Sequence, residues 1–246
     1  MTSERVVQRV ILAIVLVGVL FRAIILVSSD NFTGGICTER LMAAMKIRED
    51  PSLARNFSAA LGPLHLYLMA LAVPFSSSDV ALGPRLVTLL FSLLLLWCFA
   101  RFTRLYFDET TALGATVLAA FYPLHAIYSG LTMSEVPFHA LLFACLYAYE
   151  RYRRDSQHAG WRLAASAVLF NAACLTRFES LVFIPLLVLG LRGCPRRHQW
   201  AFGLGICCAP VAWLGMNWAW AGSPMAFLTG SMEQSRAEIA HNRLHG

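Results

Sequence analysis

The stretch AALGPLHLYLMALAVPF, residues 59–75, decides how the chain is folded. Most of its residues are apolar and suit a helix in a membrane, but Gly62, Pro63 and Pro74 interrupt it and His65 is polar. A spanning helix needs about 20 mostly apolar residues. Whether this stretch crosses the membrane therefore sets the orientation of every segment that follows it.

The composition is typical of a membrane protein. Of the 246 residues, 58% are hydrophobic and 14% are charged, whereas ordinary soluble domains have about 45–50% and about 25%. The formal net charge is +6, but the Arg residues stand in small groups between apolar blocks. That pattern reflects membrane topology, so we expect no nucleic-acid partner. The Cys residues lack the spacing of a zinc site or a disulfide framework, and we interpret them as small apolar residues.

The Arg groups decide whether residues 59–75 cross the membrane, because short Arg-rich loops stay on the cytoplasmic side. If this stretch crossed and the N-terminus were inside, three of the four Arg groups would lie outside. If it lies along the outer interface or re-enters there, all four groups lie inside. They comprise residues 5 and 9, 101 and 104, 151–162, and 192–197.

We therefore predict an all-α transmembrane bundle of about seven spans, with a cytoplasmic N-terminus and juxtamembrane helices in the first outer loop. Residues 1–220 form the seven-span module, in which 29–83 is the outer loop and 59–75 its interfacial helix. We expect residues 221–246 to be an outer-face tail and the start of a further C-terminal region. The predicted spans are 9–28, 84–104, 111–128, 133–150, 162–176, 180–192 and 199–219.

This topology gathers several charged residues at the outer face. Asp30 follows the first span and is either a solvated residue that ends the helix or a general base at the membrane surface. Glu135 begins a later span, where the free amides and the helix dipole favour a carboxylate whatever its function. Arg177 and Glu179 separate two short apolar segments, and their spacing does not align them on one helical face. Arg85 is either an interfacial anchor or a second cation of a site.

Other polar residues lie inside apolar segments. Arg22 could snorkel to the outer interface or face the bundle interior. His65 and His125 are more often satisfied polar residues than metal ligands, and the sequence contains no zinc motif. The sequence therefore identifies no cofactor, and a bound divalent metal ion stays an open alternative. No P-loop, nucleophile elbow or glycine-rich dinucleotide motif is present, which disfavours nucleotide-driven and hydrolase chemistry.

An ordered set of segments resembles the GT-C-type polytopic glycosyltransferases, in particular the protein O-mannosyltransferases and the aminoarabinose transferases. The set is an Asp after the first span, then GPLHLYL, GPRLVTLLFSLLLL, ALGATVLAAFYPLHAIYSGLTMSEVPFHALL and LTRFE. The order and spacing of these segments carry the resemblance over residues 8–220. The family often has Asp-Glu and His-Pro-Pro where this chain has Asp30-Asn31 and Gly62-Pro63-Leu64-His65. Family members are also longer, so the chain is either a fragment or the shared module alone.

The resemblance implies a membrane glycosyltransferase that moves a hexose or pentose from a polyprenyl phosphate to an acceptor at the outer face. The acceptor is a lipid, a glycan or a protein. Asp30 and Glu135 match the positions of the family's two catalytic acids. The resemblance implies that Asp30 is the general base.

Arg85 and Arg177 lie on the side where the donor phosphate would bind, with Glu179 and His65 as supporting residues. The resemblance places the chain in a bacterial inner membrane as a multi-pass protein. The alternatives are a polytopic transporter or flippase and a non-catalytic subunit that keeps only this module.

Overall fold

The computed structural model describes residues 2–29, 35–51, 62–76, 79–155 and 159–225. Helices account for 84% of these described residues and no strand occurs among them, which confirms the predicted all-α bundle. The helices are α1 (Thr2–Ser28), α2 (Gly35–Glu49), α4 (Pro63–Ala72), η2 (Val73–Phe75), α5 (Leu82–Thr103), α6 (Glu109–Phe121), α7 (Pro123–Ser129), α8 (Glu135–Arg153), α9 (Gly160–Thr176), η3 (Phe178–Val182), α10 (Phe183–Gly190), α11 (Arg196–Ile206) and α12 (Cys208–Ala221).

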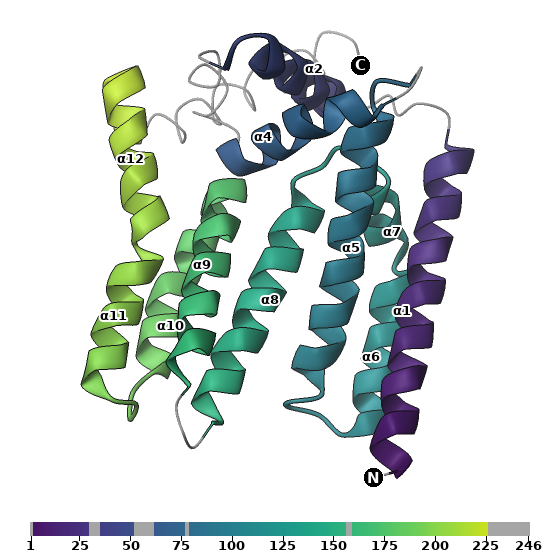
Figure 1. The fold of residues 1–246 in the computed structure, drawn as a ribbon, viewed down its shortest axis with the longest axis vertical. Coiled ribbons are helices and arrows are strands. Elements are labelled where there is room, and N and C mark those ends of the chain that lie inside the picture. Colours follow the sequence, from purple (N-terminus) through teal and green to yellow (C-terminus); the bar gives the residue numbers. More distant parts are fainter. Residues whose placement is uncertain (1, 30–34, 52–61, 77–78, 156–158, 226–246) are drawn as a thin grey trace, which may run out of the picture.

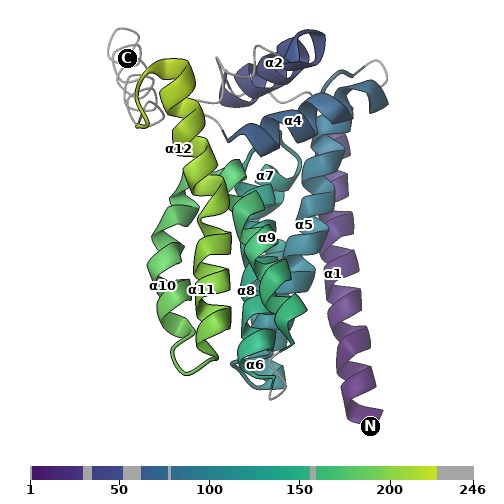
Figure 2. The same cartoon turned by 60° about the vertical axis from the view of Figure 1, so that its left-hand side comes forward.

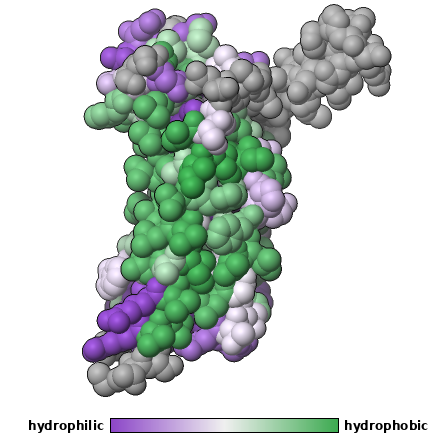
Figure 3. All heavy atoms as spheres, turned by 90° about the vertical axis from the view of Figure 1, so that its right-hand side faces the viewer, coloured by the Kyte–Doolittle hydropathy of each residue, from purple (hydrophilic) through white to green (hydrophobic). Residues whose placement is uncertain are grey.

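The long helices run alongside one another, and α2 and α4 lie across one end of them (Figure 1; Figure 2). Successive long helices alternate in direction, so the N-terminus and the loops after α5, α8 and α10 share the opposite end. Those are the helix ends that carry the Arg groups. On the face shown in Figure 3, a broad hydrophobic belt separates hydrophilic residues that gather toward the two ends. We call the end covered by α2 and α4 the capped end.

Three of the described helical segments are long and apolar enough to cross a membrane: Glu4–Ser28 in α1, Leu82–Thr103 (α5), and Arg196–Trp220, which covers α11 and most of α12. A fourth candidate is the pair α6 and α7, bent by 57° where they meet. Helix α9 has only 17 residues, and α8 begins and ends with charged residues. Length and composition therefore do not add these two helices to the candidate spans. The number of seven spans therefore stays a prediction.

Two glycines let α4 lie against the ends of the long helices. A Cβ on Gly62 would lie 2.0 Å from the carbonyl oxygen of Thr176, at the end of α9, and one on Gly83 would lie 2.0 Å from the carbonyl oxygen of Ala72. Only a hydrogen atom fits at these two contacts. On its other side α4 packs on α2 through a small apolar cluster of Ala43, Ala44, Ile47, Leu66, Met69 and Ala70. Residues 62–75 thus cross the bundle end, the arrangement expected of a helix at a membrane surface.

Two tyrosines fix the C-terminal end of α8, which lies away from the capped end. The hydroxyl of Tyr149 donates a hydrogen bond of 2.6 Å to the carbonyl oxygen of Leu187 in α10. The hydroxyl of Tyr152 lies 2.7 Å from Nδ1 of His198 in α11. Helix α8, with 19 residues, is therefore anchored to its neighbours far from the capped end.

Arg22 faces the bundle interior and does not snorkel, since it is fully buried. Pro123 has no N–H to pair with the carbonyl of Ala119, so the helix breaks between α6 and α7. Arg22 supplies the missing donors: Nη2 donates to the oxygen of Ala119 at 3.0 Å, Nη1 donates to that of Ala120, and Nε donates to Oγ of Ser129 at 3.1 Å. One guanidinium thus holds α1 to both halves of the bent pair.

Replacing Arg22 with Met should lower the thermal unfolding midpoint in detergent by about 5 °C or more. The substitution keeps an apolar stem but leaves buried acceptors without donors, and each such loss costs about 1–3 kcal/mol. Arg9→Met is the control, because Arg9 is exposed on the same helix. Equal midpoints for the two variants would contradict this role.

Candidate functional site

The site is centred on the carboxylate of Glu135, the first residue of α8. Nη1 of Arg177 forms an ion pair with Oε1 of Glu135, and Nη1 of Arg40 lies 3.5 Å from Oε2. Nη1 of Arg177 also donates to Oγ of Ser134 at 3.2 Å. These cations come from α2 and from the turn after α9, so three segments distant in sequence meet at the capped end.

Arg177 also pairs with Glu179, with Nη2 at 2.5 Å and Nε at 3.1 Å from Oε1. The sequence did not indicate this pair, because residues two apart do not face each other on a helix. Arg177 is not helical: its φ of −151° and ψ of 132° place it in an extended conformation between α9 and η3. Burial opposes the charge of Arg177, but hydrogen bonds and ion pairs with Glu179 and Glu135 outweigh it and raise its pKa.

Arg40 is a site residue that the sequence analysis missed. It is only 7% exposed, and its Nε is buried without a hydrogen-bond partner among the described residues. A signal was present in the sequence: Arg40 shares the helical stripe of Cys37, Ala43, Ala44 and Ile47, all of them buried. A charged residue in an otherwise small and apolar stripe indicates a buried partner of opposite charge.

His65 links α4 to the turn that precedes Glu135. Its Nε2 lies 3.2 Å from the carbonyl oxygen of Thr132, and Oγ1 of Thr132 donates to the carbonyl oxygen of Cys37 at 3.1 Å. Burial, together with the charge of Arg40, lowers the pKa of His65 to about 4. The imidazole is therefore neutral at pH 7 and donates from Nε2 to that carbonyl, so His65 supports the turn and carries no charge into the site.

Arg85 is buried and is occupied by backbone acceptors. Its Nη2 donates at 2.8 Å to the carbonyl oxygen of Leu26 and at 2.8 Å to Oγ of Ser29, while its Nε donates at 2.6 Å to the oxygen of Gly130. Asp79 lies 3.9 Å from its Nη1. Arg85 thus joins the end of α1 to the turn that leads to Glu135.

Asp30 lies outside the described residues. The residue before it, Ser29, is the one that Arg85 ties to the turn at the capped end. Of the residues singled out from the sequence, the structure brings together Glu135, Arg177 and Glu179, with His65 beside them. Among the described residues, no group of three or more His, Cys, Asp or Glu side chains is arranged to hold a metal ion.

A family model described as dolichyl-phosphate-mannose-protein mannosyltransferase matches residues 60–216. The chain belongs to this family. Its members are membrane glycosyltransferases that use sugars linked to polyprenyl phosphate. The matched region contains His65, Arg85, Glu135, Arg177 and Glu179, whereas Asp30 precedes it. No curated protein and no solved structure matches the chain.

Replacing Gly62 with Ala should reduce sugar transfer from a polyprenyl-phosphate donor by at least about tenfold, because small displacements of positioning groups are costly. The new methyl group would push α4 away from the Thr176 carbonyl, which directly precedes Arg177. Gly114→Ala is the control, since nothing lies within 4 Å of a Cβ there. Transfer rates and unfolding midpoints would be measured for both variants. Unchanged transfer by the Gly62 variant would show that this contact does not position the site.

Proposed function

We propose that this chain transfers a sugar from polyprenyl phosphate to an acceptor hydroxyl or similar nucleophile at the outer face of a bacterial inner membrane. Asp30 acts as the general base. The observation that carries the proposal is the carboxylate of Glu135 held between Arg177 and Arg40 at the capped end, to which Arg85 also ties Ser29. Ser29 directly precedes Asp30 in the sequence.

The reaction requires one group that accepts a proton and another that stabilises a leaving phosphate. As the acceptor oxygen bonds to C1 of the sugar, its proton passes to Asp30. The bond between C1 and the phosphate oxygen breaks, and polyprenyl phosphate leaves with its electron pair. The transition state has oxocarbenium character, and a single displacement inverts the configuration at C1.

Arg177 is our candidate for the cation that receives the leaving phosphate. Its side chain keeps 26% of its surface exposed even though it pairs with two carboxylates. A guanidinium binds phosphate with two parallel hydrogen bonds, which suits this role. Glu135 orients Arg177 and Arg40, and Glu179 holds Arg177 from the other side. Where water is scarce, one such cation lowers the barrier by about 3 kcal/mol.

Phosphate binding by Arg85 stays a prediction, and its contacts favour a different role. The guanidinium of Arg85 already serves the carbonyls of Leu26 and Gly130 and the hydroxyl of Ser29. In the proposed mechanism Arg85 positions the segment that carries Asp30 relative to the turn before Glu135. A transporter or flippase and a non-catalytic subunit are the outcomes that the following experiments would reveal instead.

Replacing Asp30 with Asn should abolish transfer while folding is retained, because the amide cannot accept the proton. We expect a loss of about 10²–10⁴-fold, the usual contribution of a general base. Purified protein would be incubated with polyprenyl-phosphate hexose or pentose and a panel of a Ser/Thr peptide, a glycan and a lipid alcohol. Mass spectrometry would measure the released polyprenyl phosphate.

Glu109→Gln is the matched control, because that carboxylate lies at the other end of the bundle and is half exposed. It should transfer at the wild-type rate. Full activity of the Asp30 variant would remove Asp30 from the base role. Wild-type protein that moves the lipid across vesicles without releasing sugar would favour the flippase.

Replacing Arg177 with Gln should lower kcat by about 100-fold, since the developing phosphate charge loses its cation. Arg177→Lys should restore part of this loss, because an ammonium keeps the charge without the two-pronged geometry. Arg192→Gln, at the opposite end, should leave kcat unchanged. The rates would be measured at saturating donor. Equal kcat for the Gln variant and the wild type would contradict the phosphate role.

A further inference from the structure

Arg40 is a buried cation whose donors are poorly matched by acceptors. Its side chain is only 9% exposed. Its Nη1 lies 3.3 Å from the sulfur of Met133, which is a weak acceptor, and 3.5 Å from Oε2 of Glu135, at the limit of a hydrogen bond. Its Nε is buried and has no hydrogen-bond partner among the described residues. Because a buried charge with unmet donors is costly, Arg40 favours a conformation that brings an anion closer to it.

Arg177, in contrast, pairs with two carboxylates. Glu179 accepts hydrogen bonds from its Nε and Nη2, and Glu135 forms an ion pair with its Nη1. Together with Arg40 these side chains form a cluster of two cations and two anions, which has no net charge. A phosphate that approaches Arg177 therefore meets two negative groups. One of them has to move aside before the guanidinium can offer the phosphate two parallel hydrogen bonds.

Of the two carboxylates, that of Glu135 has a second cation within reach. Its Oε2 is 3.5 Å from Nη1 of Arg40 while its Oε1 pairs with Arg177. A displacement of less than about 1 Å would reach the distance of about 2.7–2.9 Å that is usual between a guanidinium nitrogen and a carboxylate oxygen. Glu179 is 43% exposed, and its only ion pair among the described residues is with Arg177. Glu135 is therefore the carboxylate that can leave Arg177 and keep a cationic partner.

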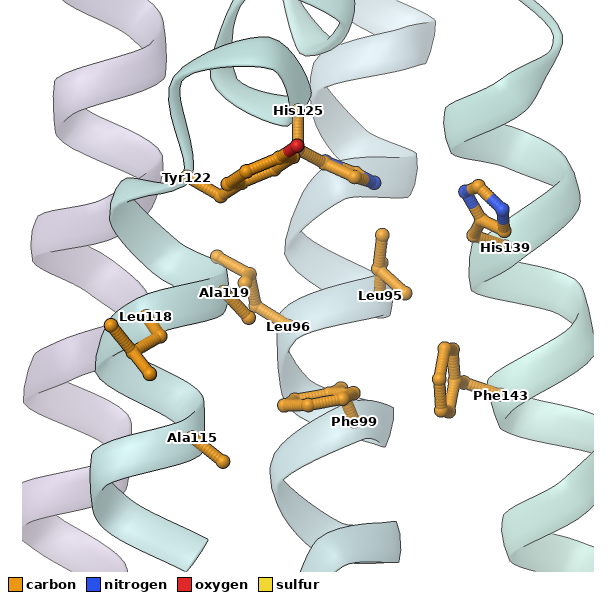
Figure 4. A pocket seen from close by; sticks show the side chains of 10 residues that line it. All are labelled: Leu95, Leu96, Phe99, Ala115, Leu118, Ala119, Tyr122, His125, His139 and Phe143. Atoms are coloured by element: carbon orange, nitrogen blue, oxygen red, sulfur yellow. The ribbon is translucent and has the colours of Figure 1, made fainter.

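Two imidazoles near Glu135 do not offer it such a partner. His139 lies one turn later on α8, but its ring lines the groove between α5, α6, α7 and α8, where it faces the ring of His125 (Figure 4). His65 is neutral at pH 7, and its Nε2 lies 3.2 Å from the carbonyl oxygen of Thr132. Arg40 is thus the group that matches the carboxylate in both charge and position.

We propose that Arg40 is a positioning residue that takes over the carboxylate of Glu135 when the donor phosphate binds Arg177. In the free protein Glu135 holds Arg177. As the phosphate arrives, Glu135 turns toward Nη1 and Nε of Arg40, and Nη1 of Arg177 becomes available to the phosphate oxygens. This inference rests on the proposed function and adds to it the step that opens the phosphate site.

The exchange keeps every charge of the cluster paired. The ion pair between Glu135 and Arg177 is replaced by one between Glu135 and Arg40 and by another between Arg177 and the phosphate. No carboxylate or guanidinium is left alone in a site of low dielectric, where an unpaired charge is expensive. Arg40 acts through Glu135 and not on the substrate, because its side chain is 9% exposed whereas that of Arg177 is 26% exposed.

Binding of sugar-free polyprenyl phosphate to the full chain in detergent micelles tests the exchange without sugar transfer. Native mass spectrometry would measure the Kd. Arg40→Gln should weaken binding about tenfold, because the carboxylate of Glu135 then stays on Arg177 and competes with the phosphate. Arg48→Gln is the matched control and should bind as wild type, since Arg48 is an exposed cation on the same helix.

A second substitution distinguishes the exchange from a simple loss of positive charge. In the Arg40→Gln background, Glu135→Gln should restore the Kd to within about twofold of wild type, because the competing carboxylate is gone. In the wild-type background, Glu135→Gln should change the Kd by less than about twofold, because Arg40 already draws the carboxylate away. Equal effects of Glu135→Gln in the two backgrounds would overturn the inference. A double variant that binds no better than Arg40→Gln would also overturn it.

The conservative variant supplies a further readout that a purely structural role would not give. Arg40→Lys keeps a cation for Glu135 and should bind polyprenyl phosphate more tightly than Arg40→Gln. Unfolding midpoints would be measured for every variant. If Arg40→Gln does not fold, the single variant Glu135→Gln decides: a Kd within about twofold of wild type supports the inference, and a larger change overturns it.

These measurements separate the inference from the proposed function. Equal effects of Glu135→Gln in the two backgrounds, with sugar transfer by the wild type, would refute the exchange alone. The expected set of Kd values in a wild-type protein that transfers no sugar would retain the exchange and refute the transferase proposal. Wild-type protein that does not bind polyprenyl phosphate would overturn both.

Discussion

The guanidinium groups of Arg22, Arg85 and Arg177 lie at least partly out of water and must be matched by oxygen acceptors, and the fold depends on how that requirement is met. An unpaired charge in a low-dielectric interior costs several kcal/mol. Arg22 meets this requirement with carbonyls released by the Pro123 break, and Arg85 meets it with the carbonyl oxygens of Leu26 in α1 and of Gly130. Arg177 meets it with carboxylates. These side chains hold together helices whose apolar surfaces alone would pack with little preference in a membrane.

The three arrangements differ in what they leave available for chemistry. Backbone carbonyls occupy Arg22 and Arg85 on most sides, so these residues join helices. Arg177 is different, because its partners are charged, partly exposed and placed where the capping helices meet the bundle. A carboxylate that holds a cation in the absence of substrate keeps that cation oriented until a phosphate can share it. Under the proposed function, Glu135 and its partners therefore combine a structural contact with a phosphate-binding surface.

The sequence was sufficient for the class of fold, because apolar blocks separated by Arg groups allow few alternatives to a helical bundle. It also indicated that residues 59–75 differ from the spans, since Gly62 and Pro63 mark the start of a separate helix. It did not reveal the pairing of Arg177 with Glu179, which depends on an extended backbone at one residue. Arg40 was missed although it lies on a small apolar stripe of α2, because its importance appears only when the fold brings Glu135 to it. The number of spans is undetermined by length and composition, since α8 and α9 are too charged or too short to be recognised in isolation.

Helix α8 connects the two surfaces of the molecule and carries a further consequence. Its 19 residues correspond to a rise of about 28 Å, close to the hydrocarbon thickness of about 30 Å in a typical bilayer. Tyr149 and Tyr152 anchor its far end to α10 and α11, so α8 cannot slide freely to adjust. With α8 as one of the predicted spans, the lipids around the protein would set the height of Glu135 relative to the headgroups. In the proposed reaction, bilayer thickness would then determine how deeply a lipid-borne phosphate must sink before it meets Arg177.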